Sequence, residues 1–186
     1  RDADIDAPEG WDTRRETLAG QVIAILDTGI AKTHEDLAAN LWTGSGGIHG
    51  YDAINGDNDP EDDNGHGTHV AGIIGAAGNN GIGVSGVAWK TSLMAVKMLD
   101  STGTGSTDQE LAAYNWVLQK KKEGVNIVAV NASYGGGGST PAAKNAIEAL
   151  GDRGILFVAA AGNDGENNDT NPQYPASYSL PNVLSV

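Results

Sequence analysis

The sequence predicts an α/β fold, a three-layer sandwich in which helices cover both faces of a mainly parallel central sheet. Buried-looking apolar segments alternate with amphipathic ones along the 186 residues. Continuously apolar strands are typical of parallel sheets, because helices cover both of their faces. A chain of this length can bury one substantial core, and we find no repeat or linker that would indicate a second domain.

Each element is predicted by a local pattern. Strands are predicted at residues 22–26, 93–99, 127–131 and 155–160, and residues 183–186 resemble the beginning of another. Ser106-Thr107 starts a helix, with a glutamine three residues after the serine as in a capping box. Three lysines before Gly124 suit the end of that helix. Thr140-Pro141 opens a second helix, which ends near Gly151.

Composition excludes several classes of function. Acidic residues outnumber basic ones by 24 to 11, which gives a formal net charge of −13. We therefore expect neither nucleic acid nor a membrane surface as a partner. The absence of cysteine rules out disulfides and thiolate metal sites, and the apolar runs are too short to span a membrane. Because no signal peptide precedes Arg1, we expect either a cytoplasmic or an already processed protein.

A carboxylate follows the first predicted strand, in Leu26-Asp27-Thr28-Gly29. Ser133 and Asn163 also follow predicted strands, and parallel strands end at one edge of a sheet, where ligands bind. Sequence therefore predicts one site containing Asp27, Ser133 and Asn163. An Asp-Thr-Gly loop also occurs in aspartic proteases, in which two carboxylates share a proton. We find no second copy, so that alternative requires a homodimer.

His66 lies between glycines in Asn64-Gly65-His66-Gly67-Thr68-His69, at the start of an apolar stretch. A general base needs one ring nitrogen facing the nucleophile and the other fixed, usually by a carboxylate. The small neighbours allow the start of a helix to pack closely against the sheet. His69 raises the alternative of a zinc pair, but His-Glu-x-x-His sites need a spacing of four and a glutamate. We interpret His69 as structural, and His34 and His49 as ordinary histidines.

Three segments together resemble the subtilisin-like serine proteases, or subtilases, from near residue 4 to residue 186: the strand ending at Asp27, the His66 segment, and Ala159–Asn163. The resemblance implies a subtilisin-like fold and a serine endopeptidase. Asp27 would orient His66, His66 would act as the base, and Asn163 would donate to the oxyanion. Residues 1–186 would be the N-terminal portion of a single catalytic domain, incomplete at the C-terminus.

The Gly-Thr-Ser segment that carries the nucleophile in this family would lie after Val186, so the C-terminal remainder of the protease is an expected partner. This chain alone is predicted to be inactive. Because residues 183–186 look like a strand cut short, we expect a truncated or nicked protease. Two alternatives stay open: a non-catalytic subtilase-like module that binds peptides or a partner, and the aspartic-protease-like homodimer. The resemblance also implies an extracellular mature form, after removal of a signal and a propeptide.

The expected substrate is a protein or peptide. The resemblance assigns these residues to substrate binding: Ser133, Tyr134, Gly135, Ala160, Ala161 and Gly162. Bare glycine backbone near Tyr134 would let a peptide add as a strand, although many subtilases have an aliphatic residue at this position. The small residues 160–162 would leave a roomy, mainly apolar primary pocket. Ser133 is not in a Gly-x-Ser-x-Gly elbow, so we reject it as the nucleophile.

Residues 78–84, Gly-Asn-Asn-Gly-Ile-Gly-Val, resemble a calcium loop inserted in a helix of many subtilases. The implied structural calcium ligands are the Asp36 carboxylate, the Asn80 side chain and the carbonyls of Gly78, Ile82 and Val84. Asp4 or Asp6 is a looser candidate. The acidic residues 57–63 resemble a further calcium loop, and a solvated acidic loop explains them equally well. They do not form an EF-hand, because the sixth position is Asp62 and not glycine.

Overall fold

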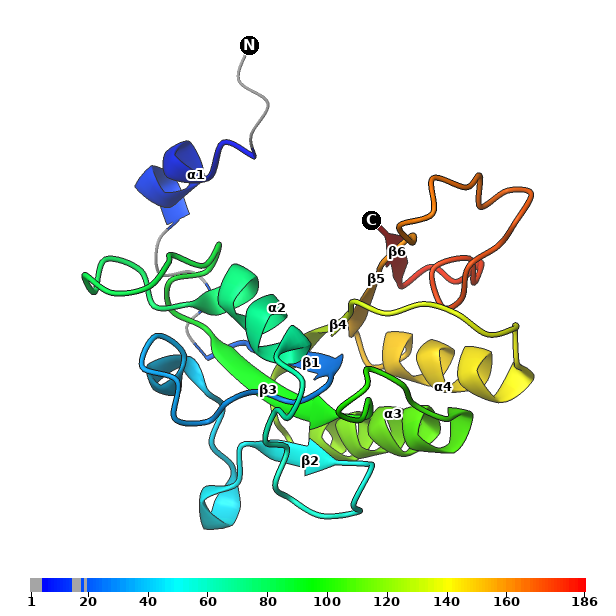
Figure 1. Cartoon of the computed structure of the whole chain (residues 1–186), viewed down its shortest axis with the longest axis horizontal. Helices are drawn as coiled ribbons and strands as arrows, with labels where there is room; N and C mark the ends of the chain where they lie inside the picture. The colour runs from blue at the N-terminus through cyan, green and yellow to red at the C-terminus, as the bar shows by residue number, and fades with distance from the viewer. Residues whose placement is uncertain (1–4, 15–17, 19) are drawn as a thin grey trace.

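The computed structural model describes residues 5–14, 18 and 20–186, and it shows the predicted α/β sandwich (Figure 1). Within these residues one sheet has the strand order β2-β3-β1-β4-β5-β6, and every neighbouring pair is parallel. The strands are β1 (Val22–Asp27), β2 (Gly50–Asp52), β3 (Ser92–Lys97), β4 (Ile127–Ala132), β5 (Leu156–Ala159) and β6 (Val183–Ser185). The predicted fold class is confirmed, and the sheet is parallel throughout the described residues.

The helices are α1 (Ala7–Arg14), α2 (His66–Gly75), α3 (Thr107–Lys122) and α4 (Pro141–Gly151), with 3₁₀ turns at Ala38–Asn40 and Ser45–Gly47. The capping box of α3 is present: the Ser106 hydroxyl accepts from the Gln109 N–H, and the Gln109 side chain accepts from the Ser106 N–H. At the start of α4, the Thr140 hydroxyl accepts from the Ala143 N–H. These side chains satisfy donors that a helix start otherwise leaves unpaired.

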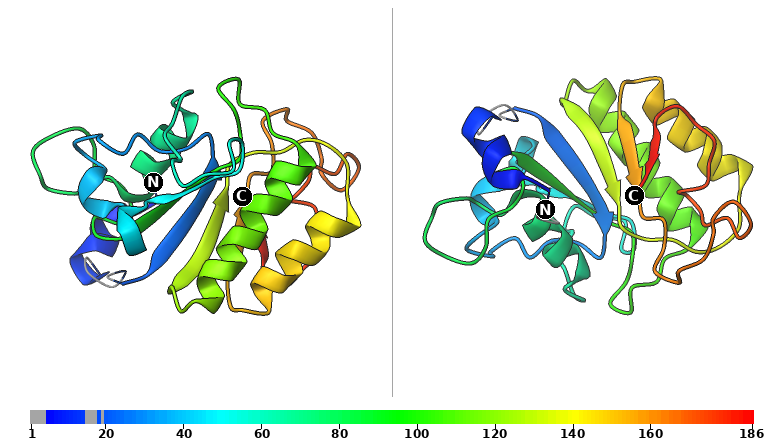
Figure 2. Two further views of the ribbon diagram at one scale, coloured as in Figure 1. Left: turned by 90° about the horizontal axis from the view of Figure 1, so that it is seen from below. Right: turned by 90° about the horizontal axis from the view of Figure 1, so that it is seen from above.

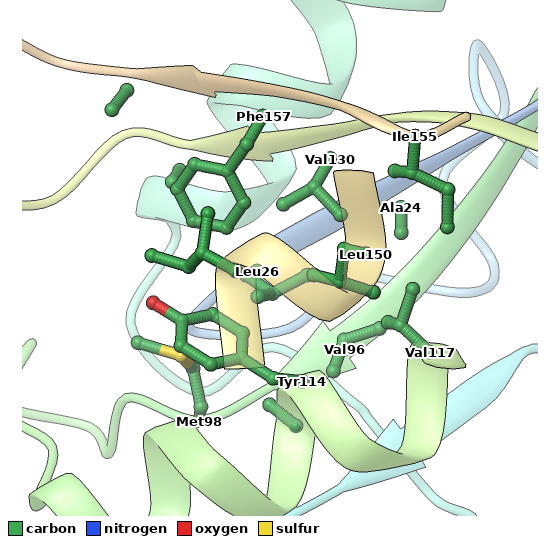
Figure 3. Close-up of a cluster of buried hydrophobic side chains, with 14 of the residues drawn as sticks. Ala24, Leu26, Val96, Met98, Tyr114, Val117, Val130, Leu150, Ile155 and Phe157 are labelled. Atoms are coloured by element: carbon green, nitrogen blue, oxygen red, sulfur yellow. The ribbon is translucent and has the colours of Figure 1, made fainter. Parts of the chain in front are cut away.

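Helices α3 and α4 cover one face of the sheet, and α2 packs against the other (Figure 2). Alternate residues of β1 serve the two layers: Leu26 contributes to the core under α3 and α4, and Ile25 to the core under α2. Tyr114 of α3 meets Phe157 of β5 edge to face at a centroid distance of 5.6 Å (Figure 3). Burying each such large apolar side chain contributes about 1.5–3 kcal/mol, so continuously apolar strands stabilise both layers.

The layer on the α2 side leaves apolar side chains exposed. Leu156 of β5 is 42% exposed, Leu184 of β6 is 48% exposed and Ile73 of α2 is 57% exposed. None of the helices in the described part of the chain combines the length and apolarity needed to cross a bilayer.

Candidate active site

Asp27 and His66 meet at the carboxyl edge of the sheet. Asp27 is the last residue of β1 and is fully buried, whereas His66 is the first residue of α2 and its side chain is 50% exposed. The His66 Nδ1 atom lies 2.7 Å from Asp27 Oδ1. The Thr28 N–H donates to the same oxygen, at 2.7 Å, and also fixes the carboxylate.

This contact determines the tautomer of His66. A carboxylate only accepts hydrogen bonds, so Nδ1 must carry the proton and Nε2 keeps its lone pair. In the described part of the chain Nε2 makes no hydrogen bond, and the half-exposed ring leaves it open to a reacting group. Asp27 Oδ2 is buried and has no partner among the described residues. The pair therefore presents one fixed ring nitrogen to the carboxylate and the other to a reacting group.

Two glycines allow α2 to start directly against the end of β1. A Cβ atom on Gly67 would lie 2.1 Å from the Gly29 carbonyl oxygen, closer than any real Cβ contact. Gly29 has φ of 112°, and its own Cβ would lie 2.6 Å from the Pro60 carbonyl oxygen. The expectation that small residues permit this close packing is confirmed. Any side chain at Gly67 would push His66 away from Asp27.

Asp62 organises the loop before His66. Its Oδ1 atom accepts from the Thr28 hydroxyl and from the N–H groups of Asn64 and Gly65. Its Oδ2 atom accepts from both the N–H and the hydroxyl of Thr68. Burial alone would raise the pKa of Asp62, but the hydrogen bonds from Gly65, Thr68 and Asn64 outweigh burial and lower this pKa to about 2.

The donors at the start of α2 are all satisfied. The Asn64 side chain accepts from the His66 N–H, the Thr28 hydroxyl accepts from the Gly67 N–H, and Asp62 accepts from the Thr68 N–H. Because negative charge is favourable at a helix N-terminus, the Asp62 carboxylate also suits its position. These contacts fix the helix that carries the imidazole.

A buried lysine links the aspartate strand to the histidine loop. Lys97, at the end of β3, is 2% exposed and lies beside Asp27 in the parallel register. Its Nζ atom donates to the Thr28 carbonyl at 2.7 Å, to the Leu99 carbonyl at 3.1 Å and to Asp63 Oδ1 at 2.6 Å. A buried ammonium needs such partners, and here they connect three segments around Asp27.

Asn163 lies in the loop after β5, at the same edge of the sheet as Asp27. Its side chain is exposed and makes no hydrogen bond with the described part of the chain, so its amide is available to a ligand. The preceding segment is anchored: the Ala160 N–H donates to the Ala132 carbonyl, and the Asn168 side chain donates to the Ala161 carbonyl. Ala161 and Gly162 line a small cavity of about 100 Å³ with polar neighbours from residues 164–173.

The predicted substrate segment follows β4, next to the loop of Asn163. The Ser133 hydroxyl accepts a hydrogen bond from the Asn131 side chain, two residues earlier in the same segment. Tyr134 turns its ring toward the core, where its hydroxyl meets the Tyr114 hydroxyl at 2.6 Å. Gly135 has no side chain, and its backbone lines a cavity that Tyr134 also lines. The structure thus places the six predicted substrate residues after two adjacent strands, β4 and β5.

The loop of residues 78–84 wraps around Asp36, which is 1% exposed. The Asn80 amide donates to Asp36 Oδ1 at 2.7 Å, and the Val84 N–H donates to Oδ2 at 2.8 Å. Gly83 lies so close that a Cβ atom there would be 2.1 Å from Oδ2. The structure therefore brings the predicted ligands Asp36 and Asn80 together. Asp4 lies outside the described residues, and Asp6 precedes α1.

The acidic stretch 57–63 is bound to the rest of the protein. Lys32 pairs with Asp59 and with Glu61, and Lys97 pairs with Asp63. Among the described residues no group of three or more His, Cys, Asp or Glu side chains is arranged to hold a metal ion. Much of this stretch thus neutralises lysines and positions the His66 loop.

Comparison with known proteins identifies the family that this geometry belongs to. The sequence profile of the subtilase family matches residues 19–186. The chain belongs to the subtilase family. It is 37% identical over 182 residues to thermitase of Thermoactinomyces vulgaris, an alignment that covers 98% of this chain and 59% of thermitase.

Two further relatives extend this subtilase comparison. The minor extracellular protease Epr of Bacillus subtilis (strain 168) is 38% identical over 157 residues, covering 84% of this chain and 22% of Epr. A cold adapted subtilisin-like serine proteinase of known crystal structure superposes with a TM-score of 0.73 at 31% identity, covering 90% of this chain and 54% of that chain. The subtilase chain therefore spans little more than half of this structure and of thermitase.

Sequence reasoning missed Asp62 and Lys97 as parts of this subtilase site. An acidic residue just before a predicted helix start is a signal for a capping role, and it could have identified Asp62. A lysine ending an otherwise apolar strand could have identified Lys97 as a buried cation. The partners of both residues come from distant segments, so the pattern alone would not have named them.

Proposed function

We propose that this chain supplies the aspartate and the histidine of an Asp-His-Ser triad that hydrolyses peptide bonds. The observation that carries the proposal is the 2.7 Å contact between His66 Nδ1 and buried Asp27, with Nε2 making no hydrogen bond to the described residues. Membership of the subtilase family supports it. The serine would come from the C-terminal remainder of the protease, beyond residue 186.

Each residue has a definite role in this reaction. His66 Nε2 takes the proton of the serine hydroxyl as it attacks the scissile carbonyl, and later returns a proton to the leaving amine. Asp27 holds the ring in the required tautomer and stabilises the imidazolium. Asn163 donates its side-chain amide to the developing oxyanion. Its exposed amide, which makes no hydrogen bond with the described residues, fits this role.

The exposed apolar groups of α2, β5 and β6 support a second polypeptide segment as partner. Ile73, Leu156 and Leu184 are each between 42% and 57% exposed, and a covering layer would remove them from water. On this proposal the C-terminal remainder packs over this side and brings its serine to the carboxyl edge of the sheet. The remainder thus both completes the triad and completes the core.

The substrate is proposed to be a protein or peptide bound as an extended strand beside Ser133, Tyr134 and Gly135. The small residues 160–162 favour an apolar primary side chain. The His66–Asp27 pair supports the serine triad over an aspartic dyad, since a dyad places a second carboxylate, and not an imidazole, against Asp27. A non-catalytic peptide-binding module would need no such pair.

We also propose structural calcium and an extracellular location. Asp36 fits a calcium site because its buried carboxylate lies against a glycine-containing loop, and the Asn80 side chain beside it carries an amide oxygen that could turn to the ion. The carbonyls of Gly78, Ile82 and Val84 would complete the oxygen ligands that calcium prefers. Bound calcium would supply charge that fixes this loop, and it would take no part in the reaction. The extracellular assignment is supported by the name of the relative Epr.

The test compares peptide hydrolysis by the complete protease with hydrolysis by two histidine variants. His66→Ala should lower kcat by about 10⁶-fold, the size of effect seen in subtilisin itself, with an unchanged circular dichroism spectrum. His49→Gln is the control, because the His49 ring contacts Trp42 and Thr43 and no residue of the proposed triad, and it should retain turnover. Full turnover by His66→Ala would overturn the proposal.

A further inference from the structure

A second cavity lies beside the proposed peptide strand. It measures about 340 Å³ and is enclosed by the loop 103–107, the segment 134–137, and Met98 and Leu99 at the end of β3. Glycines on both loops present main chain to this space, so an extended peptide running along residues 133–136 would direct one of its side chains into it. The volume lies in the range of sites that bind a ligand-sized group.

One carboxylate, that of Glu110 in the first turn of α3, lines this cavity. Its Oε1 atom accepts from the Tyr114 hydroxyl at 2.5 Å and from the Tyr134 hydroxyl at 3.3 Å. Tyr114 is 1% exposed and packs in the core (Figure 3), so the carboxylate is held by a rigid group. Burial, and then the Glu110 charge, raise the pKa of Tyr134 well above its usual value, so its hydroxyl stays a neutral donor.

Among the described residues Glu110 has no ion-pair partner. Both tyrosines bond to Oε1, and within the described residues Oε2 makes no hydrogen bond. No lysine, arginine or histidine of the described chain lines the cavity, whose other walls are glycine backbone, hydroxyl groups and apolar side chains. A fixed carboxylate in a partly enclosed, otherwise neutral space attracts a cation more strongly than one in open water.

We propose that Glu110 is a specificity-determining residue that binds a lysine or arginine side chain of the peptide substrate. The long apolar stem of such a side chain would contact Met98 and Leu99, and its charged end would reach Oε2. The inference rests on the proposed function, because it assumes that a peptide occupies the strand beside Tyr134. It assigns a basic preference to this cavity, separate from the apolar preference expected of the primary pocket at residues 160–162.

The experiment measures kcat/KM of the complete protease on peptides that differ at one residue. Arginine, lysine and the uncharged norleucine are placed in turn at each position on the amino side of the cleaved bond. One position should favour arginine or lysine over norleucine by about tenfold, which corresponds to an ion pair of about 1.4 kcal/mol. This preference should fall as salt is added, because salt screens the pair.

Glu110→Gln keeps an oxygen that can accept from both tyrosines but removes the charge, so the ratio of basic to norleucine peptide should fall to about one. Asp108→Asn is the matched control: it removes the same charge from the same helical turn, outside the cavity, and should keep the tenfold ratio. A basic preference that survives Glu110→Gln would overturn the inference. If Glu110→Gln does not fold, a wild-type preference that does not respond to salt overturns it instead.

Two further outcomes distinguish this inference from the function on which it rests. Hydrolysis of norleucine and basic peptides at equal rates at every position would overturn the assignment of Glu110 and leave the protease proposal intact. Hydrolysis of no peptide in the series would overturn both. A tenfold preference that Glu110→Gln abolishes and Asp108→Asn retains is the result expected.

Discussion

Asp62→Asn tests whether a carboxylate outside the proposed triad holds the histidine loop in place. Asparagine has the same shape, but it replaces Oδ2 with an amino group that faces the Thr68 N–H and hydroxyl, both donors in the folded protein. The three donors to Oδ1 keep their acceptor. The substitution therefore removes the charge and places the new amide N–H groups against the two Thr68 donors at the start of α2.

The pKa of Asp62 provides the magnitude. Lowering this pKa from 3.8 to about 2 corresponds to roughly 2.4 kcal/mol of folding free energy at neutral pH. Because solvent partly screens the carboxylate, we expect about 1–2 kcal/mol. The folded protein holds the ionised form, so this stabilisation is fully present above about pH 4 and is lost as the pH falls toward 2.

Equilibrium urea unfolding at pH 7 and at pH 2.5 measures the size of this stabilisation and the direction of its pH dependence. At pH 7 Asp62→Asn should unfold with a free energy about 1–2 kcal/mol below that of the wild type. The difference should shrink at pH 2.5, because the unfolded chain is by then mostly protonated at Asp62 while the folded protein has only begun to bind that proton. Asp169→Asn, at an exposed position in the loop after β5, should change neither value by more than about 0.5 kcal/mol. An equal difference at the two pH values would refute the electrostatic reasoning.

Two other predictions concern the packing of α2 and the calcium loop. Gly67→Ala should lower the free energy of unfolding by about 1–3 kcal/mol and reduce kcat, because its methyl group would lie 2.1 Å from the Gly29 oxygen. Gly72→Ala is the control, since Gly72 lies on the same helix with open space around it. Equal stability of the two variants would contradict the packing argument. Calcium chelation should lower Tm in the wild type and have less effect in Asp36→Asn, as followed by differential scanning calorimetry; a Tm that chelation leaves unchanged would contradict the calcium proposal.

The fold class was predictable because its signals are local. Continuously apolar strands such as residues 22–26 occur where both faces of a sheet are covered, and Ser106 and Thr140 cap helices through contacts within three residues. The short strand β2 was not predicted. It has three residues, Gly50–Asp52, and it forms because β3 offers an edge to pair with, which no local pattern records.

The candidate site was predictable only in part, because only some of its residues carry a local sequence signal. Asp27 and His66 were identified from short motifs whose residue types already specify a base and its carboxylate partner. Asp62, Lys97 and Glu110 lie in segments that resemble a solvated acidic loop, a strand end and an ordinary helix start. Their roles arise from hydrogen bonds to residues far along the chain, such as that from the Thr28 hydroxyl to Asp62. Such contacts exist only once the sheet has assembled.

Helix α2 connects the proposed catalytic and calcium sites, because it is held at both of its ends. Asp62 and Thr28 fix its first turn, and at its last residue the Gly75 carbonyl accepts from the Asn40 side chain. The Ala77 N–H, two residues further on, donates to the Asp36 carbonyl. Loosening the Asp36 loop would therefore first destabilise the C-terminal end of this ten-residue helix. The imidazole at the other end would move only if the contacts at the helix N-terminus also broke. Calcium loss should consequently reduce stability before it alters turnover, whereas Asp62→Asn should affect both together.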